Sequence, residues 1–372
     1  MTSGHQGESF YTLTLQDLDN LIKKLVTAGY TVYGPVIQDG AIVYDVIDSV
    51  RQLPVGWRDV QAPGHYRLEK RGDNAYFGFV VGPQSWKKIL YPPKAKLCTI
   101  TRDGDVQFNR EDGGRMAFLG VRGCELEAIR VLDKVLLGGK YQDPIYKGRR
   151  EKISIIAVNC VEPGSNCFCA SMGTGPETRD GYDISLTEVL DGDKHFFLAK
   201  PNTATGLQLL EEIKAVEASS EEVAAAKMAM RDAISKFHKK LAVEGLRERA
   251  YGELEGSAWS EIAGRCLACG NCTLVCPTCF CTTIEDSTTL DMSVAERWRR
   301  WDSCFTSSFS FIHGGPIRSS IGSRYRQWFM HKLVTWIDQF GLQGCVGCGR
   351  CITWCPVGID ITEEAARLGD RK

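Results

Sequence analysis

The sequence has almost no net charge and no long apolar run, and these shortages exclude several classes of protein. Its 45 Lys and Arg balance 46 Asp and Glu, for a formal charge of −1, so nucleic-acid or membrane-surface binding would need a local patch. No apolar run reaches the ~18 residues that a membrane span needs. The opening stretch MTSGHQGESFYTLTLQ lacks the basic and apolar regions of a signal peptide. We therefore expect a cytoplasmic protein with no membrane span and no nucleic-acid partner.

The motifs of common nucleotide-binding and hydrolase folds are also missing. The chain has no G-x-G-x-x-G after an expected strand, no G-x-x-x-x-G-K-[ST] and no G-x-S-x-G. A flavin or nicotinamide site on this chain is therefore unsupported. If the protein works with NAD(P)H, a partner subunit is expected to hold the flavin.

Cysteine, in contrast, is abundant, with 16 in 372 residues. Thiols stay reduced in the cytoplasm, so metal or redox chemistry is a better expectation than disulfides. Two similar phrases stand out: CLACGNCTLVCP at 266–277 and CVGCGRCITWCP at 345–356. Both have the pattern CxxCxxCxxxCP.

This pattern is typical of two-cluster ferredoxins, where three closely spaced thiolates bind one [4Fe-4S] cube and the fourth binds the other cube. We predict two [4Fe-4S] clusters with crossed ligands. The first set is Cys266, Cys269, Cys272 and Cys355, and the second set is Cys345, Cys348, Cys351 and Cys276. Zinc needs four ligands and would leave the third cysteine of each triplet unexplained. With every coordination position filled, such clusters pass electrons and do not bind substrate.

Four further cysteines occupy the N-terminal half of the chain: Cys124, Cys160, Cys167 and Cys169. Two of them follow expected strands, and the segment 159–176 has the Gly, Pro and Ser content of a loop able to wrap a cofactor. A third [4Fe-4S] cluster, a zinc site, a redox-active pair at Cys167 and Cys169, and plain buried cysteines are all open interpretations.

The roles of the remaining chemically active residues are left open. Cys279, Cys281 and Cys304 lie close in sequence to the two phrases and would shield a cluster, serve as alternative ligands or do neither, while Cys98 is expected to be structural. Arg and aromatic residues alternate at 297–301 and 318–332. We interpret them as interface or cluster support, against the alternative of a DNA-binding redox sensor. His313 and His331 have no second histidine at a ligand spacing, so solvated or packed roles are expected.

The hydrophobic patterns predict an α+β chain in three parts. Residues 1–205 form an α/β domain with a mixed sheet: a helix over 14–28, strands at 30–36, 41–47 and 75–82, then a strand from 116, a helix from 125 and a buried strand at 152–160. Residues 206–255 form a helical connector, whose second helix starts at Ser219 and Glu222 and ends at Gly245. Residues 256–372 form a mainly helical domain holding the two cysteine phrases, with a helix around 329–340 between them.

Several segments together resemble one known family. GVRGCELEAIRVLDKV, RREKISIIAVNCVEPGSNCFCASMGTGP, GYDISLT, CPTCFC and RWDSC, with PGHYRL and GPQSWKKILYPP near the N-terminus, are similar to the iron–sulfur beta subunit of cytoplasmic nickel–iron hydrogenases (sulfhydrogenases). They are equally similar to the iron–sulfur subunit of anaerobic sulfite reductase, which belongs to the same family. The similarity covers nearly the whole chain. Around Cys124 the family more often has Pro or Ser before the cysteine and Asp after it, where this chain has Gly123 and Glu125.

The resemblance implies a non-catalytic electron-transfer subunit of an oxidoreductase complex. Its expected partners are a flavin subunit that uses NAD(P)H and the small and large subunits of a hydrogenase, or the catalytic subunit of a sulfite reductase. The residues alone also leave open an enzyme that reduces sulfur compounds through Cys167 and Cys169.

Overall fold

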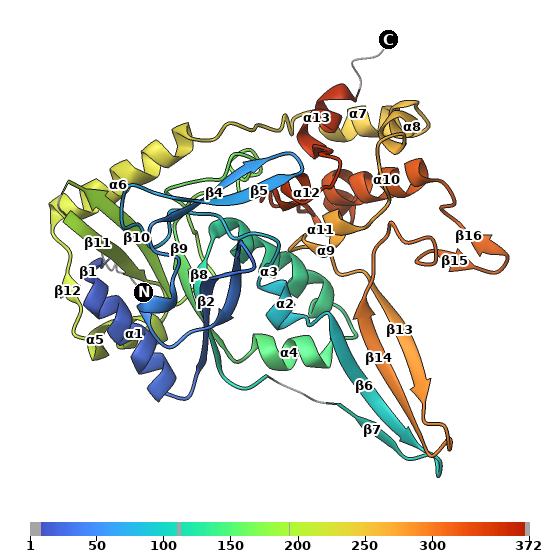
Figure 1. The fold of residues 1–372 in the computed structure, drawn as a ribbon, viewed down its shortest axis with the longest axis horizontal. Helices are drawn as coiled ribbons and strands as arrows, with labels where there is room; N and C mark the ends of the chain where they lie inside the picture. The colour runs from blue at the N-terminus through green and yellow to red at the C-terminus, as the bar shows by residue number, and fades with distance from the viewer. Residues whose placement is uncertain (1–8, 110–112, 193, 369–372) are drawn as a thin grey trace, which may run out of the picture.

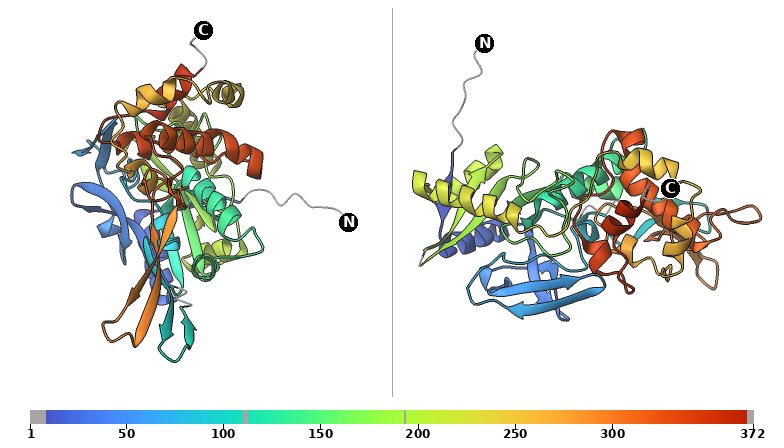
Figure 2. Two further views of the ribbon diagram at one scale, coloured as in Figure 1. Left: turned by 90° about the vertical axis from the view of Figure 1, so that its right-hand side faces the viewer. Right: turned by 90° about the horizontal axis from the view of Figure 1, so that it is seen from above.

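The computed structural model describes residues 9–109, 113–192 and 194–368. Residues 1–8, on which part of the signal-peptide expectation falls, lie outside the described ranges. One end of the molecule carries the large sheet and the other carries short helices, with two β arms projecting beside the helical end (Figures 1 and 2).

The main sheet has eight strands in the order β12-β1-β11-β10-β9-β8-β2-β3. Its central strands β2, β8, β9 and β10 run parallel to one another, whereas the pairs toward both edges are antiparallel. The predicted mixed sheet is therefore confirmed. The strands are β1 (Tyr11–Leu13), β2 (Thr31–Gln38), β3 (Ala41–Val46), β8 (Met116–Val121), β9 (Ile153–Val158), β10 (Ile184–Asp191), β11 (Lys194–Pro201) and β12 (Val216–Glu217).

The helices predicted around the sheet begin where the sequence indicates. Helix α1 (Leu15–Thr27) starts with a reciprocal hydrogen-bond pair between Thr14 and Asp17 and is followed by Gly29 at φ +81°. Helix α3 (Gly123–Leu136) connects β8 to the parallel strand β9. This crossover places the residues after β8 and after β9 at the same edge of the sheet.

Helices cover both faces of the sheet. Along β11, Phe197 packs in the same core as α1 and α5 (Ala204–Glu212), whereas Phe196 and Leu198 pack against α6 (Ser220–Ser235). Because side chains alternate along a strand, α6 lies on the face opposite α1 and α5. A 3₁₀ turn (Val50–Gln52), the hairpin β4 (Trp57–Ala62) and β5 (His65–Lys70), and helices α2 (Lys87–Leu90) and α4 (Pro144–Arg150) complete this part.

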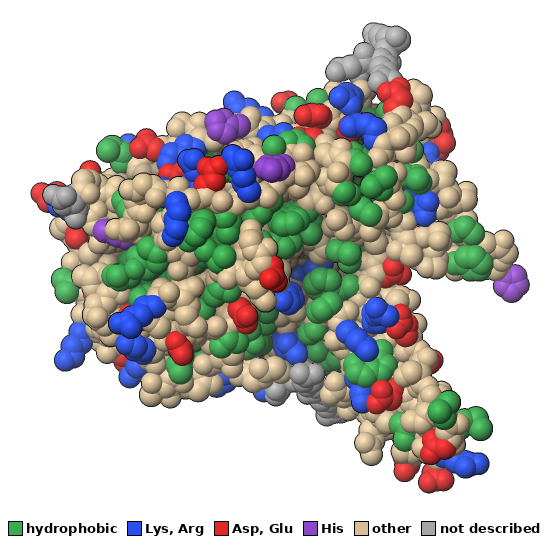
Figure 3. All heavy atoms as spheres, in the orientation of Figure 1, with side chains coloured by type: hydrophobic (Ala, Val, Ile, Leu, Met, Phe, Trp, Pro, Cys, Tyr) green, Lys and Arg blue, Asp and Glu red, His purple; other side chains and the backbone are tan. Residues whose placement is uncertain are grey.

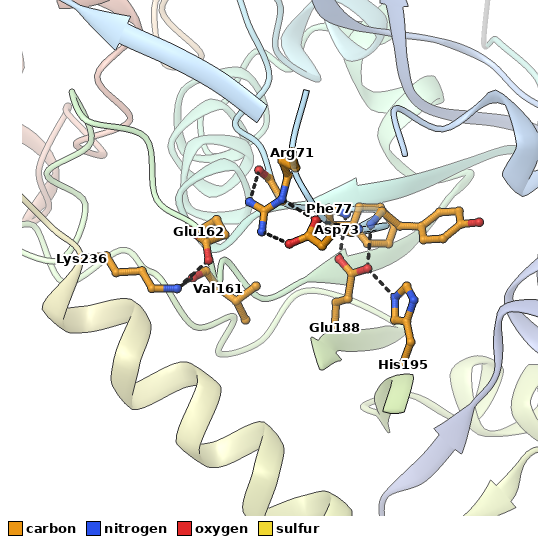
Figure 4. A network of polar contacts seen from close by, with 11 residues as sticks. Arg71, Asp73, Phe77, Val161, Glu162, Glu188, His195 and Lys236 are labelled. Carbon is orange, nitrogen blue, oxygen red and sulfur yellow. Dashed lines mark hydrogen bonds and ion pairs between the residues drawn. The ribbon is translucent and has the colours of Figure 1, made fainter. Parts of the chain in front are cut away.

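The strand predicted at 75–82 is wrong. This buried segment joins no sheet, because side chains take its backbone hydrogen bonds. The Glu188 carboxylate accepts from the amides of Tyr76 (2.7 Å) and Phe77 (2.8 Å), and the Arg122 guanidinium donates to the carbonyl of Phe77 (2.7 Å), as Figure 4 shows for the Glu188 contacts. Apolar content alone cannot distinguish a central strand from a buried loop satisfied in this way.

The connector is helical only in part. The N-terminus of α6 has the predicted capping box of Ser219 and Glu222, but the helix ends at Ser235 and an irregular segment follows. Gly245, predicted to end this helix, instead precedes α7 (Leu246–Gly252) at φ +66°. Phe237 is buried beside three of the N-terminal cysteines, so the irregular segment packs against a candidate site.

The C-terminal part consists of short helices with two β arms that were not predicted. The helix expected around 329–340 is present as α10 (Ile321–Met330), a π-helical turn (His331–Thr335) and α11 (Trp336–Phe340). The long arm combines β13 (Thr282–Thr288) and β14 (Val294–Trp301) with β6 (Lys94–Thr101) and β7 (Val106–Phe108) of the N-terminal half. The short arm is β15 (Phe311–Ile312) with β16 (Gly315–Pro316). The remaining helices are α8 (Ala258–Ala263), α9 (Asn271–Leu274), α12 (Arg350–Thr353) and α13 (Ile361–Arg367).

The two halves have separate hydrophobic cores that meet around one loop. The second core is built from the C-terminal helices, yet it includes the fully buried Phe168 from the loop 159–176. No helix within the described ranges is both long and apolar enough to cross a membrane.

Candidate metal centres

Cavity one gathers the first predicted ligand set. Its wall includes Cys266, Cys269, Cys272 and Cys355, together with Cys351. Three of the predicted ligands lie on the turn before and within α9, and Cys355 arrives from the second phrase. Phe305, Tyr325, Trp328 and Ile359 make the rest of the wall largely apolar. The crossing inferred from the spacing is thus present in the geometry, while the ligand role of these thiols stays a prediction.

Cavity two gathers the second predicted set. Its wall includes Cys345 and Cys348 from the turn before α12, Cys351 from α12 itself, and Cys276 from the first phrase. Cys351 borders both cavities. The two sites therefore share one wall.

The two phrases make the same turn. Ala268 (φ +53°) and Gly347 (φ +65°) hold equivalent positions in left-handed conformation, and so do Gly270 (φ +78°) and Gly349 (φ +73°). A Cβ on Gly347 would stand 2.7 Å from the backbone of Cys169, so this position requires glycine for space as well as for conformation. Left-handed turns of this kind point backbone N–H groups toward a central anion.

Backbone amides in and near these turns donate to cysteine sulfurs. Ala268 donates to Cys266 Sγ (3.4 Å) and Gly347 to Cys345 Sγ (3.4 Å), and Ile359 donates to Cys355 Sγ (3.3 Å). Hydrogen bonds to ligand sulfurs help to set the reduction potential of an iron–sulfur cluster.

The buried thiols of cavities one and two are better suited to bind a cationic metal group than to serve only as core side chains. Burial raises the pKa of Cys345 to about 12 and that of Cys348 to about 11, with the neighbouring thiols adding to the effect. Burial likewise raises the pKa of Cys272 and Cys351 well above the usual value. Several thiolates in one apolar cavity are therefore unfavourable unless a metal compensates their charge and deprotonates them. The residues of both cavities thus fit [4Fe-4S] clusters.

Buried cations that the sequence did not reveal lie against the cysteines. Lys332, on the π-helical turn, lines cavity two and donates to Thr278 Oγ1 (2.5 Å). Burial opposes its charge, but the thiols of Cys276, Cys279 and Cys345 outweigh burial and raise its pKa. Lys87 donates to the carbonyl of Cys279 (3.1 Å), and burial lowers its pKa. A lysine in a helical pattern is usually solvated, so nothing in the sequence signalled these positions.

Arg350 links the second phrase to the N-terminal half. Its guanidinium donates to Glu125 Oε1 (2.6 Å), and both residues are almost completely buried. The other oxygen of Glu125 accepts from Tyr44 (2.7 Å) and from Trp86 (3.1 Å). Glu125 follows Cys124 directly, so one ion pair fixes the N-terminal cysteines against cavity two.

The four N-terminal cysteines come together at a third cavity. Cys124 follows β8 and Cys160 follows β9, and these neighbouring strand ends bring the two residues to one place, as predicted. Cys167 and Cys169 reach the same cavity from the loop 159–176. This loop is held by Phe168, whose amide donates to the carbonyl of Gly347 (2.8 Å). It is also held by an ion pair between Glu162 and Lys236 at the end of α6 (2.6 Å; Figure 4).

The other cysteines line none of these three cavities. The thiol of Cys279 is hydrogen-bonded to Cys276 and lowers the pKa of that thiol, and Cys304 likewise lowers the pKa of Cys281 to about 7. Cys98 is buried in β6. His331 accepts a hydrogen bond from Trp336 Nε1 (2.9 Å) and is packed, whereas His313 is exposed in the short arm.

The Arg and Trp segments divide between two roles. Residues 297–301 lie in β14, where Arg297 pairs with Asp286 across the hairpin (2.7 Å) and Trp301 packs against the N-terminal half. Tyr325 and Trp328 from the segment 318–332 line cavity one. On the face drawn in Figure 3, basic and acidic side chains are intermingled.

Comparison with known proteins agrees with this geometry. Residues 265–359 match the family model of the 4Fe-4S dicluster domain. The chain is 30% identical to the sulfhydrogenase 2 subunit beta of Pyrococcus furiosus over 333 residues, which cover 88% of this chain and 89% of that protein. No solved structure matches the chain significantly. The chain therefore belongs to the family of the sulfhydrogenase beta subunits.

Proposed function

We propose that this chain is the electron-transfer subunit of a sulfhydrogenase-type complex, carrying electrons between a flavin subunit that uses NAD(P)H and a nickel–iron hydrogenase module. The observation that carries the proposal is the pair of adjoining cavities, each lined by a crossed set of four cysteines. [4Fe-4S] clusters bound there would supply one-electron transfer.

The protein's own residues support this role in two ways. Each set of four thiols fills every coordination position of a cube, so neither site offers a place for substrate. Cys351 borders both cavities, and buried Lys332 places positive charge beside cavity two, which favours the reduced, more negative state.

The two arms support assembly with partner subunits. Apolar side chains are exposed at the tip of the long arm (Leu290 and Met292), further along this arm (Phe108) and on the short arm (Phe311 and Ile317). Figure 3 shows apolar side chains at both outer ends. Exposed apolar patches on projecting elements mark protein–protein contacts. We assign the arms to contacts with the other subunits of the complex.

The test uses the complex co-expressed with its hydrogenase and flavin partners. In the variant Cys266→Ser/Cys355→Ser, we expect hydrogen-dependent reduction of a viologen dye to persist, because the dye takes electrons from the hydrogenase module directly. Hydrogen-dependent reduction of NAD(P)⁺ should be lost. The matched control Cys98→Ser alters a buried cysteine outside the cavities and should retain both activities.

Three results would contradict the proposal. NAD(P)⁺ reduction that survives in the cluster variant would show that electrons bypass this chain. Copurification with a sirohaem subunit in place of a hydrogenase would instead favour the anaerobic sulfite reductase alternative. Loss of sulfur reduction in Cys167→Ser/Cys169→Ser, with an unchanged iron content, would favour a thiol-based sulfur reductase.

A further inference from the structure

The third cavity matches the two dicluster cavities in size and lining. Its wall carries Cys124, Cys160, Cys167 and Cys169. The volume of the third cavity is about 20 Å³, against about 30 Å³ in cavity one and about 20 Å³ in cavity two. The four N-terminal thiols therefore line the same kind of small cysteine-walled space as the two predicted dicluster sets.

Buried positive charge around the third cavity also favours a negatively charged group inside it. Arg122 and Arg350 both line it, and both are buried. Glu125 pairs with Arg350. Within the described part of the chain, Arg122 donates to the carbonyls of Asn159, Phe77 and Phe79 but forms no ion pair with a carboxylate. The nearby Asp59 carboxylate interacts with the Arg122 charge without forming an ion pair, so negative charge on the four thiols would further stabilise the buried guanidinium.

The spacing of the thiols distinguishes the remaining interpretations. Four thiolates on one zinc ion stand about 3.8 Å apart, given Zn–S bonds of about 2.3 Å. Among the described residues, no three His, Cys, Asp or Glu side chains come close enough to hold a single metal ion, and this applies equally to the eight dicluster cysteines. No three thiols of the third cavity are therefore placed to hold a single zinc ion.

A redox-active pair at Cys167 and Cys169 fits the geometry less well. The thiol of Cys169 is hydrogen-bonded to Cys124, and Cys167 Sγ points to the carbonyl of Cys348 (3.7 Å). Both residues are buried. Thiol–disulfide exchange needs an accessible sulfur.

We propose that Cys124, Cys160, Cys167 and Cys169 bind a third [4Fe-4S] cluster. Cys348 borders both the second and the third cavity, just as Cys351 borders the first and the second. The three sites therefore stand in series. Their role as one relay rests on the proposed function, whereas the existence of the third site does not.

Both ends of this series come close to the surface. At one end, Cys269 of cavity one is exposed. At the other, Gly175 and Pro176 of the third cavity also border an open cleft whose wall carries four cationic side chains: Arg179, Lys200, Lys227 and Arg231. A third cluster would extend the relay from the helical end of the molecule to the sheet end.

Iron analysis of the anaerobically prepared chain tests the third site. We expect about 12 iron and about 12 acid-labile sulfide per wild-type chain, and about 8 of each in Cys124→Ser/Cys167→Ser. The control Cys98→Ser should keep about 12. Electron paramagnetic resonance after dithionite reduction should lose one component in the double variant only. A wild-type chain with about 8 iron, or with one zinc per chain, would overturn the proposal, as would a double variant that keeps its full iron content.

A reciprocal variant covers the case in which the double variant does not fold. Cys266→Ser/Cys355→Ser removes ligands of cavity one alone and should retain about 8 iron, of which about 4 belong to the third site. Only about 4 iron in this variant would overturn the third cluster. The proposed relay and the proposed third cluster can fail independently of each other. A chain that holds iron only at the third site would contradict the relay through the dicluster domain but would leave the third cluster intact.

Discussion

Replacing Glu125 by Gln should destabilise the protein by several kcal/mol although the two side chains have the same shape. Glu125 accepts from Arg350 at 2.6 Å, and the two residues are only 2% and 4% exposed. Without the carboxylate, the guanidinium remains buried and uncompensated. Removing one partner of such a pair costs about 3–5 kcal/mol. That is a large share of the roughly 5–15 kcal/mol that stabilises a typical folded domain.

A double-mutant cycle separates the ion pair from other contacts of Glu125. Glu125→Gln/Arg350→Met removes both charges, so we expect it to cost less than the sum of the single changes, by about 0.5–3 kcal/mol. The assay is urea unfolding under anaerobic conditions, followed by loss of the cluster absorbance. Asp286→Asn breaks a fully exposed pair with Arg297 and serves as the control, with little expected change in the unfolding midpoint.

A loss of less than about 1 kcal/mol in the apparent stability of Glu125→Gln would show that the buried Arg350 guanidinium does not depend on this carboxylate. If the loss of stability in the double variant equals the sum of the losses in the two single variants, Glu125 and Arg350 do not stabilise each other across the two halves.

The remaining predictions concern potential, assembly and pH. Lys332→Met should lower the midpoint potential of the cluster in cavity two, because it removes a buried cation from the cavity wall. The control Lys88→Met changes a lysine on the surface and should leave this potential unchanged. Redox titrations that give the same potential for Lys332→Met and the wild-type protein would contradict this prediction. Leu290→Asp/Met292→Asp at the tip of the long arm should weaken copurification with partner subunits at unchanged iron content, and undiminished copurification would exclude the tip from the interface. Burial lowers the pKa of His331 from 6.5 to about 4. Between these two pH values the unfolded chain therefore binds a proton at His331 more readily than the folded chain does. The contribution of His331 to stability is present above about pH 6.5 and is lost as the pH falls to about 4. Thermal unfolding of His331→Phe should be less pH-dependent in that window, and an unchanged pH dependence would disprove the assignment.

The sequence predicted those helix ends and strands that are determined by residues only a few positions apart. The capping boxes at Thr14 and Ser219 and the parallel pair β8 and β9 followed from short-range chemistry. The crossing of Cys276 and Cys355 was predictable because the ferredoxin pattern itself carries long-range information. The gathering of Cys124 and Cys160 followed from the meeting of neighbouring strand ends.

Features that depend on distant partners were not predictable. The segment 75–82 has the composition of a strand, and nothing in it reveals that Glu188 will take its amides. The long arm joins β6 and β14, far apart in the sequence. Lys332 and Arg350 look like surface residues until the fold buries them beside thiols.

The crossed ligation at the centre of this account is tested most directly by paramagnetic resonance of three single variants after anaerobic reduction. Cys272→Ser and Cys355→Ser, distant in sequence, should abolish the same cluster signal, while Cys276→Ser should abolish the other. If Cys272→Ser and Cys276→Ser instead remove one common signal, each phrase binds its own cluster and the crossed arrangement is contradicted.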